Sequence, residues 1–411
     1  RVRAGEAAGA DQACARALLE AGELAELARR ARDAGAAADA SWLPVHPWQY
    51  AHLRRRHPAL LDACIDLGEG PGAGMPTASL RSLGVAHDAS LHLKLSLGVQ
   101  ALGAERVMPP RYLRNGALAQ ACLAALRERD AWLAAHLQVC DERAWWALGA
   151  APASGDAAAW IAERGDLACL LRRYPRGEGW LLPMAALGVS DARGRLPAFD
   201  ALCGGAAAST PARRRGLFAQ LARLLAELGL RCFRHGVMPE LHGQNVVLRV
   251  GADGLTGLVL RDHDTLRICP PLMAEAGVAV PDYLIDRSTP NTLILEAPGA
   301  LFAYFQTLAV GVNLYAIAAA LSEADGEDEA LAWQWIGDAL RDALAGVFGD
   351  GAAPALRELV EAALFDSASW PFKQLIEPLV GRVSIGTGMP SGLGEIANPL
   401  RAARAGQGGR R

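Results

Sequence analysis

The chain has 411 residues, of which 52% are hydrophobic and 21% are charged. This length and composition predict a globular protein with a sizeable core and two or three domains. The formal net charge of -3 and the lack of any basic run argue against a nucleic-acid partner, and with few aromatic residues they give no support for a role at a membrane.

The eight cysteines include no Cys-x-x-Cys pair, so we interpret them as scattered, reduced thiols and not as a disulfide framework or a metal site. The printed sequence starts at Arg1 and does not show the charged and then apolar segments of a signal peptide. These features predict a cytoplasmic protein.

The first predicted elements follow from residue spacing. Residues 11–33 are rich in alanine with leucines at helical spacing, which predicts an amphipathic helix. Trp42–Gln49 contains two prolines and predicts a stiff entry into a further helix, and residues 66–78, rich in Gly and Pro, predict a loop. Leu91–Leu97 alternates strictly between leucine and polar residues, which predicts a half-buried strand. The polar side chains on its second face are those of His92, Lys94 and Ser96.

The middle of the chain predicts helices and one boundary. Residues 116–137 and 156–174 are expected to be helical. The stretch 183–212 carries Pro, Gly and small residues, and it is the best candidate for a domain boundary. A helix over residues 213–230 is expected to follow.

Residues 297–321 contain no charged side chain. Such a stretch is long enough to cross a membrane, or it forms a helix buried in a core. Several small or polar residues interrupt the run, which favours the buried helix. They are Pro298, Gly299, Gln306, Gly311 and Asn313.

Strands 246–250 and 255–260 are predicted to form a hairpin around a Gly-containing turn, with mainly helical structure after it. Asn245 precedes this hairpin and Asp262 follows it, so their side chains are expected to meet at one end. An amide oxygen and a carboxylate are hard ligands suited to Mg²⁺ and phosphates, and kinases use the same layout. The alternative interpretation is an ordinary polar turn before a hairpin.

Gln244 lies where a kinase has the loop Asp that orients or deprotonates its hydroxyl substrate. A carboxylate substrate needs no such base, because its pKa near ~4 leaves it ionised at neutral pH. The sequence therefore favours carboxylate activation over hydroxyl phosphorylation. His242 and Arg261 are expected to neutralise charge nearby.

Other candidate site residues lie upstream. Pro76–Ser82 combines short hydroxyl side chains and an Arg next to a flexible loop, which suits phosphate binding, although a capped helix start is an equal alternative. Lys94 and Arg106 are expected either to share an anionic pocket or to face solvent, and His46 beside a Trp is either a packed or a ligand-binding side chain. Of 41 basic residues only Lys94 and Lys373 are lysine, which hints that a compact ammonium is needed there.

Taken together, these motifs resemble the IucA/IucC family, the NRPS-independent siderophore (NIS) synthetases. The match runs from about Trp42 to Leu400 in the same order throughout. It consists of HPWQ at 46–49, S-x-R-S at 79–82, H-x-K-L at 92–95, Arg106, E-x-H-x-Q-N at 240–245, R-D at 261–262, Lys373 and Asn398-Pro399-Leu400.

The resemblance implies an α+β fold with a cupped-hand architecture of thumb, fingers and palm. Residues 1–40 would be the remnant of an N-terminal thumb that is shorter than in typical members. Residues 41–205 would form the fingers, with an antiparallel sheet and the phosphate loop, and residues 206–411 a mostly helical palm with a kinase-like hairpin. ATP would lie between fingers and palm, and a homodimer is a further expectation.

The resemblance also implies ATP and Mg²⁺ as cofactors and assigns roles to individual residues. The catalytic residues would be His242, Arg106 and Lys94. The residues that hold the nucleotide and the developing adenylate would be His46, Ser79, Arg81, Ser82, Lys94, Gln244, Asn245 and Asp262. The Mg²⁺ ligands would be Asn245 and Asp262, with Glu240 as a further candidate that orients the loop.

The implied reaction is ATP-dependent adenylation of a carboxylate, such as citrate or a related polycarboxylic acid. Condensation with an amine or alcohol follows, and AMP and pyrophosphate are released. Ser82 stands where Thr is usual, and Gln100–Ala104 replaces a stretch that carries Thr and Ser in the family, which leaves the acyl substrate open. The alternatives are a kinase-like small-molecule phosphotransferase, which would release ADP, and a catalytically inactive nucleotide-binding homologue.

Overall fold

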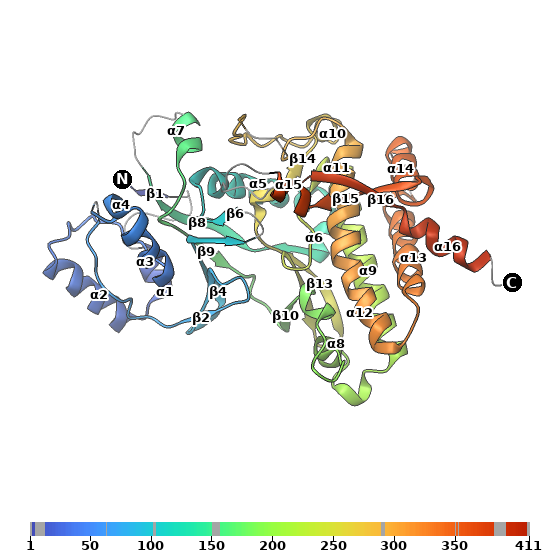
Figure 1. The fold of residues 1–411 in the computed structure, drawn as a ribbon, viewed down its shortest axis with the longest axis horizontal. Coiled ribbons are helices and arrows are strands. Elements are labelled where there is room, and N and C mark those ends of the chain that lie inside the picture. Colours follow the sequence, from blue (N-terminus) through green and yellow to red (C-terminus); the bar gives the residue numbers. More distant parts are fainter. Residues whose placement is uncertain are drawn as a thin grey trace.

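A six-stranded sheet and a mainly helical C-terminal half lie side by side, and a smaller sheet lies between them (Figure 1). Antiparallel pairing dominates both sheets, which confirms the predicted combination of helices with antiparallel sheet. The computed structural model describes residues 2–4, 13–62, 64–101, 104–149, 157–288, 292–349, 351, 353–381 and 392–408.

The N-terminal helices lie at one end of the molecule (Figure 1). The predicted helix at 11–33 is two helices, α1 (Ala13–Leu18) and α2 (Ala21–Asp33), and residues 11 and 12 lie outside the described part. The helix is interrupted between them because Glu20 caps the start of α2 in a capping box. The side chains of Glu20 and Glu23 each accept a hydrogen bond from the backbone N–H of the other. Helix α3 (Pro47–Arg56) starts at the predicted Pro-marked entry, and the short α4 (Pro58–Asp62) follows.

The six-stranded sheet has the order β1-β8-β9-β4-β3-β2, with every neighbouring pair antiparallel. The predicted strand 91–97 is β4 (Asp88–Leu95), and Leu91, Leu93 and Leu95 are buried against one face of the sheet. The chain then turns into a two-stranded hairpin of β5 (Leu97–Ala101) and β6 (Ala104–Arg106). The remaining strands are β1 (Val2–Ala4), β2 (Gly74–Pro76), β3 (Ser82–Val85), β8 (Asp141–Leu148) and β9 (Ala168–Arg173).

The predicted helix over 156–174 is wrong for most of its length. Only α7 (Ala157–Ala162) is helical, and the second part is strand β9 in the middle of the sheet. Four consecutive residues from Ala168 to Leu171 are buried, because β9 is covered on both faces. A short continuous apolar run has no alternation to mark it as a strand, so periodicity alone does not separate the two structures.

The second predicted helix, 116–137, is α5 (Pro110–Arg129) followed by α6 (Ala131–His136), with Asp130 capping the latter. The next strand, β7 (Leu137–Val139), joins the smaller sheet in the order β10-β12-β13-β7. Strand β10 is Trp180–Pro183. The predicted hairpin is confirmed as β12 (Val246–Gly251) and β13 (Gly254–Leu260), paired from Val246–Leu260 onward.

Short helices fill the stretch between β10 and the first long helix of the C-terminal half. They are η2 (Met184–Gly188), α8 (Pro197–Leu202) and η3 (Ala206–Ala208), and the domain boundary predicted in this stretch stays a prediction. Helix α9 (Pro211–Arg234) contains the predicted helix 213–230 and is longer at both ends. Thr210 caps its first turn.

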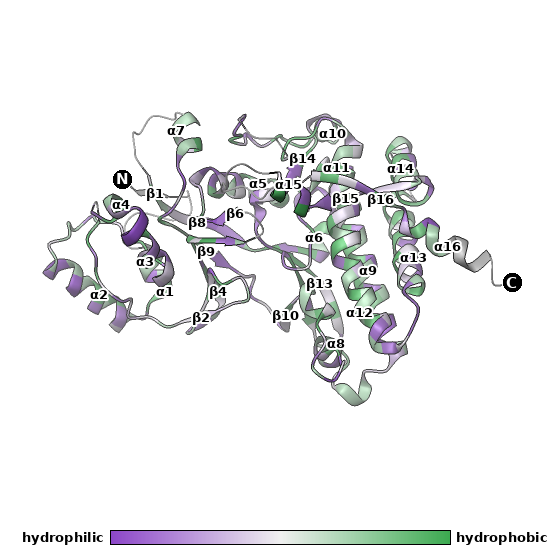
Figure 2. Ribbon diagram, viewed as in Figure 1, coloured by the Kyte–Doolittle hydropathy of each residue, from purple (hydrophilic) through white to green (hydrophobic). Residues whose placement is uncertain are grey.

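The uncharged stretch 297–321 lies in one long helix, Pro298–Asp325. It is made of α11 (Pro298–Tyr304), the π-helical η5 (Phe305–Leu314) and α12 (Tyr315–Asp325). Within the described residues it is the one helix long and apolar enough to cross a membrane, and 72% of its most apolar window is buried inside the fold. It is coloured mainly as hydrophobic in Figure 2. Its packing matches the interpretation as a buried core helix.

The C-terminal part contains one feature that the sequence did not predict, a hairpin of β15 (Ser369–Gln374) and β16 (Gly392–Ala397). Asn398 follows it, is buried, and donates hydrogen bonds to the carbonyls of Leu364 and Ser367. The helices of this part are α10 (Pro270–Glu275), α13 (Glu329–Phe348), α14 (Pro354–Glu361), α15 (Ile376–Val380) and α16 (Pro399–Gly408), with the π-helical turn η6 (Ala362–Asp366). The pair of two-residue strands β11 (Val237–Met238) and β14 (Arg267–Ile268) completes the fold.

Candidate functional site

A cleft of about 1430 Å³ opens between the six-stranded sheet and the C-terminal half. Its walls come from the loop before β3, from β4 to β6 and β9, and from the segments around the β12–β13 hairpin. All but one of the predicted site residues line it. They are Ser79, Arg81, Ser82, Lys94, Arg106, Glu240, His242, Gln244, Asn245 and Asp262.

Asp262 lies at the junction between the two halves of the cleft. The β12–β13 register brings it to the end of the hairpin where Asn245 lies, and the backbone N–H of Arg261 donates to the carbonyl of Asn245 at 3.1 Å. Lys94, from β4 in the sheet, contacts Asp262 Oδ1 through its ammonium group. The predicted convergence of Asn245, Asp262 and Lys94 on one cleft is therefore confirmed.

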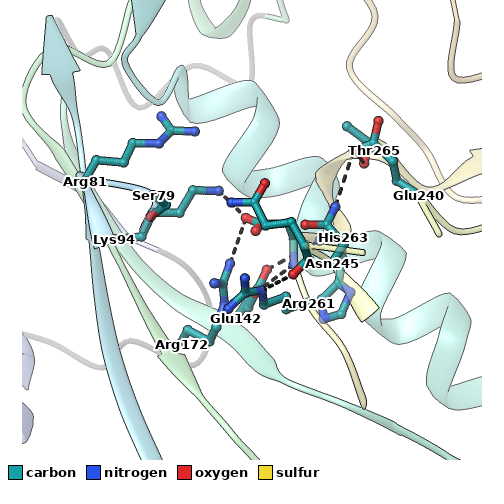
Figure 3. Close-up of polar contacts among 12 residues, drawn as sticks. Ser79, Arg81, Lys94, Glu142, Arg172, Glu240, Asn245, Arg261, His263 and Thr265 are labelled. Carbon is teal, nitrogen blue, oxygen red and sulfur yellow. Dashed lines mark hydrogen bonds and ion pairs between the residues drawn. The ribbon is translucent and has the colours of Figure 1, made fainter. Parts of the chain in front are cut away.

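Two buried residues that were not predicted from the sequence, Glu142 and Arg172 (Figure 3), hold Asp262 in place. Arg172 on β9 lies 2.7 Å from Asp262 Oδ1 and donates from Nε to Glu142 Oε1 on β8 at 2.5 Å. Glu142 Oε1 also accepts the backbone N–H of Asp262 at 2.9 Å. Burial alone would raise the pKa of Asp262, but the positive charges of Arg172 and Lys94 hold it well below its usual range. Asp262 is therefore a carboxylate at neutral pH.

Glu240 is the centre of a second cluster in the same cleft. Its carboxylate accepts a hydrogen bond from Thr265 Oγ1 at 3.0 Å and one from Asn245 Nδ2 at 3.4 Å. The basic side chains around it are His242 at 3.6 Å, Arg267 at 3.7 Å and Lys373 at 3.9 Å. Burial would raise the pKa of Glu240, but the hydrogen bond from His242 and the charge of Arg267 lower it to about 2.

These contacts allow Glu240 to orient the side chain of Asn245. Because the amide nitrogen of Asn245 is directed to Glu240, the amide oxygen of Asn245 is the atom left to face a ligand. Lys373 comes from β15, so the unpredicted hairpin delivers the second of the two lysines to the cleft. Both lysines, 94 and 373, thus line one site, in agreement with the hint from lysine usage.

Arg261 braces the loop before the hairpin. Its Nε donates to the carbonyl of Gln244 at 2.8 Å and its Nη1 donates to the hydroxyl of Tyr174 at 2.6 Å. Tyr174 follows β9, so this contact ties the loop to the sheet. Gly243 is packed so closely that a Cβ there would lie 2.9 Å from the backbone nitrogen of Ala185. The loop is therefore fixed on two sides, and Arg261 holds its backbone in place in addition to contributing positive charge.

The loop before β3 is held in a specific shape. Thr77 Oγ1 donates to the carbonyl of Ser82 at 2.8 Å, and Leu80 adopts a left-handed conformation with φ of 62°, which is unusual for a bulky residue. Arg81 Nη1 donates to the carbonyl of Arg106 at 2.6 Å. Ser82 pairs with Lys94 across β3 and β4.

Arg81 and Arg106 contribute positive charge to the cleft without direct ion pairs among the described residues. Within the described part of the chain neither has an acidic ion-pair partner, and both donate hydrogen bonds to backbone carbonyls. Burial lowers the pKa of both guanidinium groups, but from a value so high that they stay charged. Desolvated cations of this kind favour an anionic ligand such as a phosphate or carboxylate.

His46 is the predicted site residue that does not line the cleft. Its ring accepts the backbone N–H of Trp48 at 3.1 Å and so caps α3, and the ring is hydrogen-bonded to the backbone of Leu80. Burial lowers its pKa. His46 thus borders the loop that carries Ser79 and Arg81. Of the divergent segment 100–104, Ala101 and Ala104 line the cleft, and residues 102 and 103 lie outside the described part.

The oxygen atoms at this site fit Mg²⁺, which prefers one or two carboxylates together with phosphate oxygens and water. Asp262 is ionised, the amide oxygen of Asn245 is available, and Asp264 also lines the cleft. Burial raises the pKa of Asp264. Among the described residues no group of three or more His, Cys, Asp or Glu side chains could hold a metal ion by itself. A magnesium ion here would therefore share its coordination with a bound phosphate.

Two family models match this chain. The first, the IucA / IucC family, matches residues 1–189, and the second, described as ferric iron reductase FhuF-like transporter, matches residues 217–384. Staphyloferrin B synthase of Staphylococcus aureus is 35% identical over 368 residues, which cover 87% of this chain and 61% of that protein. The chain thus spans about three fifths of the length of this relative and aligns with it across both halves.

Three solved structures share the fold. The petrobactin biosynthesis protein AsbB from Bacillus anthracis superposes with a TM-score of 0.73 at 17% identity, over 100% of this chain and 68% of that one. The aerobactin synthetase IucC from Klebsiella pneumoniae gives 0.72 at 20% identity, over 98% and 68%. The ATP-bound aerobactin synthetase IucA from the same organism gives 0.65 at 18% identity, over 92% and 66%. The chain therefore matches the IucA / IucC family over residues 1–189, is similar to staphyloferrin B synthase over 87% of its length, and shares the fold of aerobactin synthetases.

Proposed function

We propose that this chain is an ATP-dependent ligase of siderophore assembly, which adenylates a carboxylate and passes the acyl group to an amine or an alcohol. The observation that carries this proposal is the meeting of Asn245, Asp262 and Lys94 in a cleft where Arg81 and Arg106 have no acidic partner among the described residues. Relatives named as siderophore synthases support it, and one of the structural neighbours was solved with ATP bound.

The reaction has two steps in this proposal. A carboxylate oxygen of the substrate attacks the α-phosphorus of ATP, the bond to the β-phosphate oxygen breaks, and pyrophosphate leaves. The amine or hydroxyl then attacks the acyl carbon and expels AMP. Gln244 in place of a loop Asp agrees with this order, because an ionised carboxylate needs no base before it attacks.

The residues of the cleft have separate tasks in these steps. Ser79, Arg81, Ser82 and Lys94 hold the phosphates, so that the positive charge is already oriented when negative charge develops at phosphorus. Arg106 and His242 face the carboxylate and fix its angle of attack. Magnesium held by Asn245 and Asp262 would neutralise the phosphate oxygens and polarise the phosphorus. Glu240 orients Asn245 through Oε2, which also accepts from Thr265, and it is the further candidate for a magnesium ligand.

The wider expectations from the sequence belong to the same proposal. We propose fingers at 41–205, a palm at 206–411, and residues 1–40 as the remnant of a thumb. Citrate or a related polycarboxylic acid is the proposed substrate class, because several cations line the cleft. We also propose a cytoplasmic location, where ATP is supplied, and a homodimer.

The test measures products from ATP. Purified protein is incubated with ATP, Mg²⁺, hydroxylamine and a panel of carboxylates that includes citrate and 2-oxoglutarate. The proposal predicts pyrophosphate and a hydroxamate with at least one acid. Asp262→Asn should abolish both, and Asp253→Asn, an exposed residue at the opposite end of the same hairpin, should leave both unchanged.

Three other outcomes would contradict the proposal. Release of ADP with a phosphorylated product would establish the phosphotransferase alternative. Binding of ATP without any product from the whole panel would indicate an inactive homologue. Equal loss of product in Asp262→Asn and Asp253→Asn would show that the hairpin matters for folding and that Asp262 has no special part in the reaction.

A further inference from the structure

Two charged residues, Glu142 and Arg172, are buried beside the proposed magnesium ligand Asp262 and take no part in the proposed reaction steps. They lie on the neighbouring strands β8 and β9, and their exposed fractions are 4% and 2%. Removing two charges from water is costly, and a buried pair seldom adds net stability over apolar residues of the same size. Their presence therefore needs an explanation other than the stability of the sheet.

Glu142 binds the backbone of the segment that carries Asp262. Its carboxylate accepts the N–H of Asp262 at 2.9 Å and the N–H of His263 at 3.4 Å. Two successive N–H groups that converge on one anion form a small backbone anion site, here filled by a side chain. His263 is fixed in addition by a contact of 3.0 Å from its Nε2 to the carbonyl of Cys140.

The backbone at Asp262 needs this support. Its φ of 59° and ψ of 66° place it in the left-handed region, directly before the tight turn His263–Thr265. A non-glycine residue in this region persists where surrounding contacts fix it. In this conformation the Asp262 side chain lines the cleft and contacts Lys94.

Arg172 fixes the side chain of the same residue. It bridges Glu142 at 2.5 Å and Asp262 Oδ1 at 2.7 Å, so the backbone and the carboxylate of Asp262 are held by one ion-paired unit. Lys94 reaches Oδ1 as well. The oxygen that these contacts leave for a ligand is Oδ2.

From this geometry we infer that Glu142 and Arg172 are positioning residues, which hold Asp262 in the orientation that binds the magnesium ion of MgATP. The inference rests on the proposed function for the metal-binding role of Asp262. Outer residues that orient a metal ligand typically contribute about 10- to 100-fold to metal affinity. Loss of Glu142 should therefore weaken the part of nucleotide binding that depends on Mg²⁺ and spare the part that does not.

The experiment measures that difference directly. Isothermal titration calorimetry gives the Kd of α,β-methylene-ATP, whose α–β bridge is not cleaved, with Mg²⁺ and again with a chelator. The ratio of the two Kd values is the coupling between metal and nucleotide. In Glu142→Gln this coupling should fall about tenfold or more, while the metal-free Kd changes by less than about twofold. Arg143→Met, which removes an exposed ion pair with Asp141 on the same strand, should behave as wild type.

A second variant distinguishes a loss of the fold from a loss of the positioning of Asp262. Glu142→Gln combined with Arg172→Met removes both charges, so no unpaired charge stays buried. Its coupling should be reduced as in the single variant, with a circular dichroism spectrum like that of wild type. Wild-type coupling in a folded single or double variant would overturn the inference, and so would equal weakening of binding with and without Mg²⁺.

The result also separates this inference from the proposed function. Wild-type protein that binds the analogue with strong magnesium coupling but yields no product from any acid would refute the ligase and leave the positioning role to be decided by the variants. Wild-type protein without any magnesium coupling would overturn the positioning role, whatever products it makes.

Discussion

His92 should make the stability of this protein depend on pH in a predictable way. It lies on β4, and its ring packs edge-on against Tyr174 with centroids 4.9 Å apart. Among the described residues its buried Nδ1 has no hydrogen-bond partner. Burial and the nearby charges of Arg172 and Arg261 lower the pKa of His92 from 6.5 to about 4.

The sign and the size follow from proton linkage. Below pH 6.5 His92 binds a proton in the unfolded chain, whereas in the folded protein it binds one only near pH 4. The contribution of neutral His92 to stability is therefore fully present above the unfolded-state pKa and is lost as the pH falls from that value to the folded-state pKa. At about 1.4 kcal/mol per pKa unit, His92 should cost about 2 kcal/mol between pH 7 and pH 5. Because the ring is only partly enclosed, solvent screening reduces this to about 1 kcal/mol.

The assay compares the wild type with His92→Phe, which keeps a ring beside Tyr174 and removes the titration. Urea unfolding at pH 7 and pH 5 gives the two free energies of unfolding, and the wild type should lose about 1 kcal/mol more than the variant. Leu93→Val is the matched control, since it shortens a buried neighbour and should lower stability by about 1 kcal/mol at both pH values. An identical pH dependence in wild type and His92→Phe would refute the reasoning.

Three further changes test the site. Lys94→Arg should slow pyrophosphate release by about 100-fold, because a planar guanidinium does not reproduce a compact ammonium; an unchanged rate would show that any cation serves. Glu240, whose pKa is lowered from 4.5 to about 2, gives stability that is present above the unfolded pKa and lost as pH falls through the folded one. Glu240→Gln should therefore cost about 3 kcal/mol at pH 7 and less at pH 3, measured by urea unfolding, and an equal cost at both pH values would contradict this. Gly243→Ala should reduce turnover more than the midpoint of thermal unfolding, because its Cβ would press on Ala185 and shift the loop; normal turnover would show that the loop position is not critical.

Two kinds of sequence pattern differ in how much of the chain they involve. The alternation at 91–97 and the turn chemistry of the hairpin are local, so they identified β4, β12 and β13 and placed Asn245 next to Asp262. The ordered motifs gave the resemblance to the IucA/IucC family and most of the predicted residues that line the cleft, because side chains suited to phosphate binding are chemically distinctive even without a structure. The prediction for the segment that forms strand β9 was wrong, since a continuous apolar run fits a buried strand and a buried helix equally well.

What the sequence by itself determined is therefore the identity of most of the predicted residues that line the cleft, because their chemistry is specific and their neighbours along the chain give them a pattern. What only the tertiary structure decided is how those residues are held. Lys94 and Asp262 are 168 positions apart, and Glu142 and Asp262 are 120 apart. An arginine or glutamate that acts through such a contact has no local periodicity or motif, and burial, which makes it important, exists only after the chain has folded.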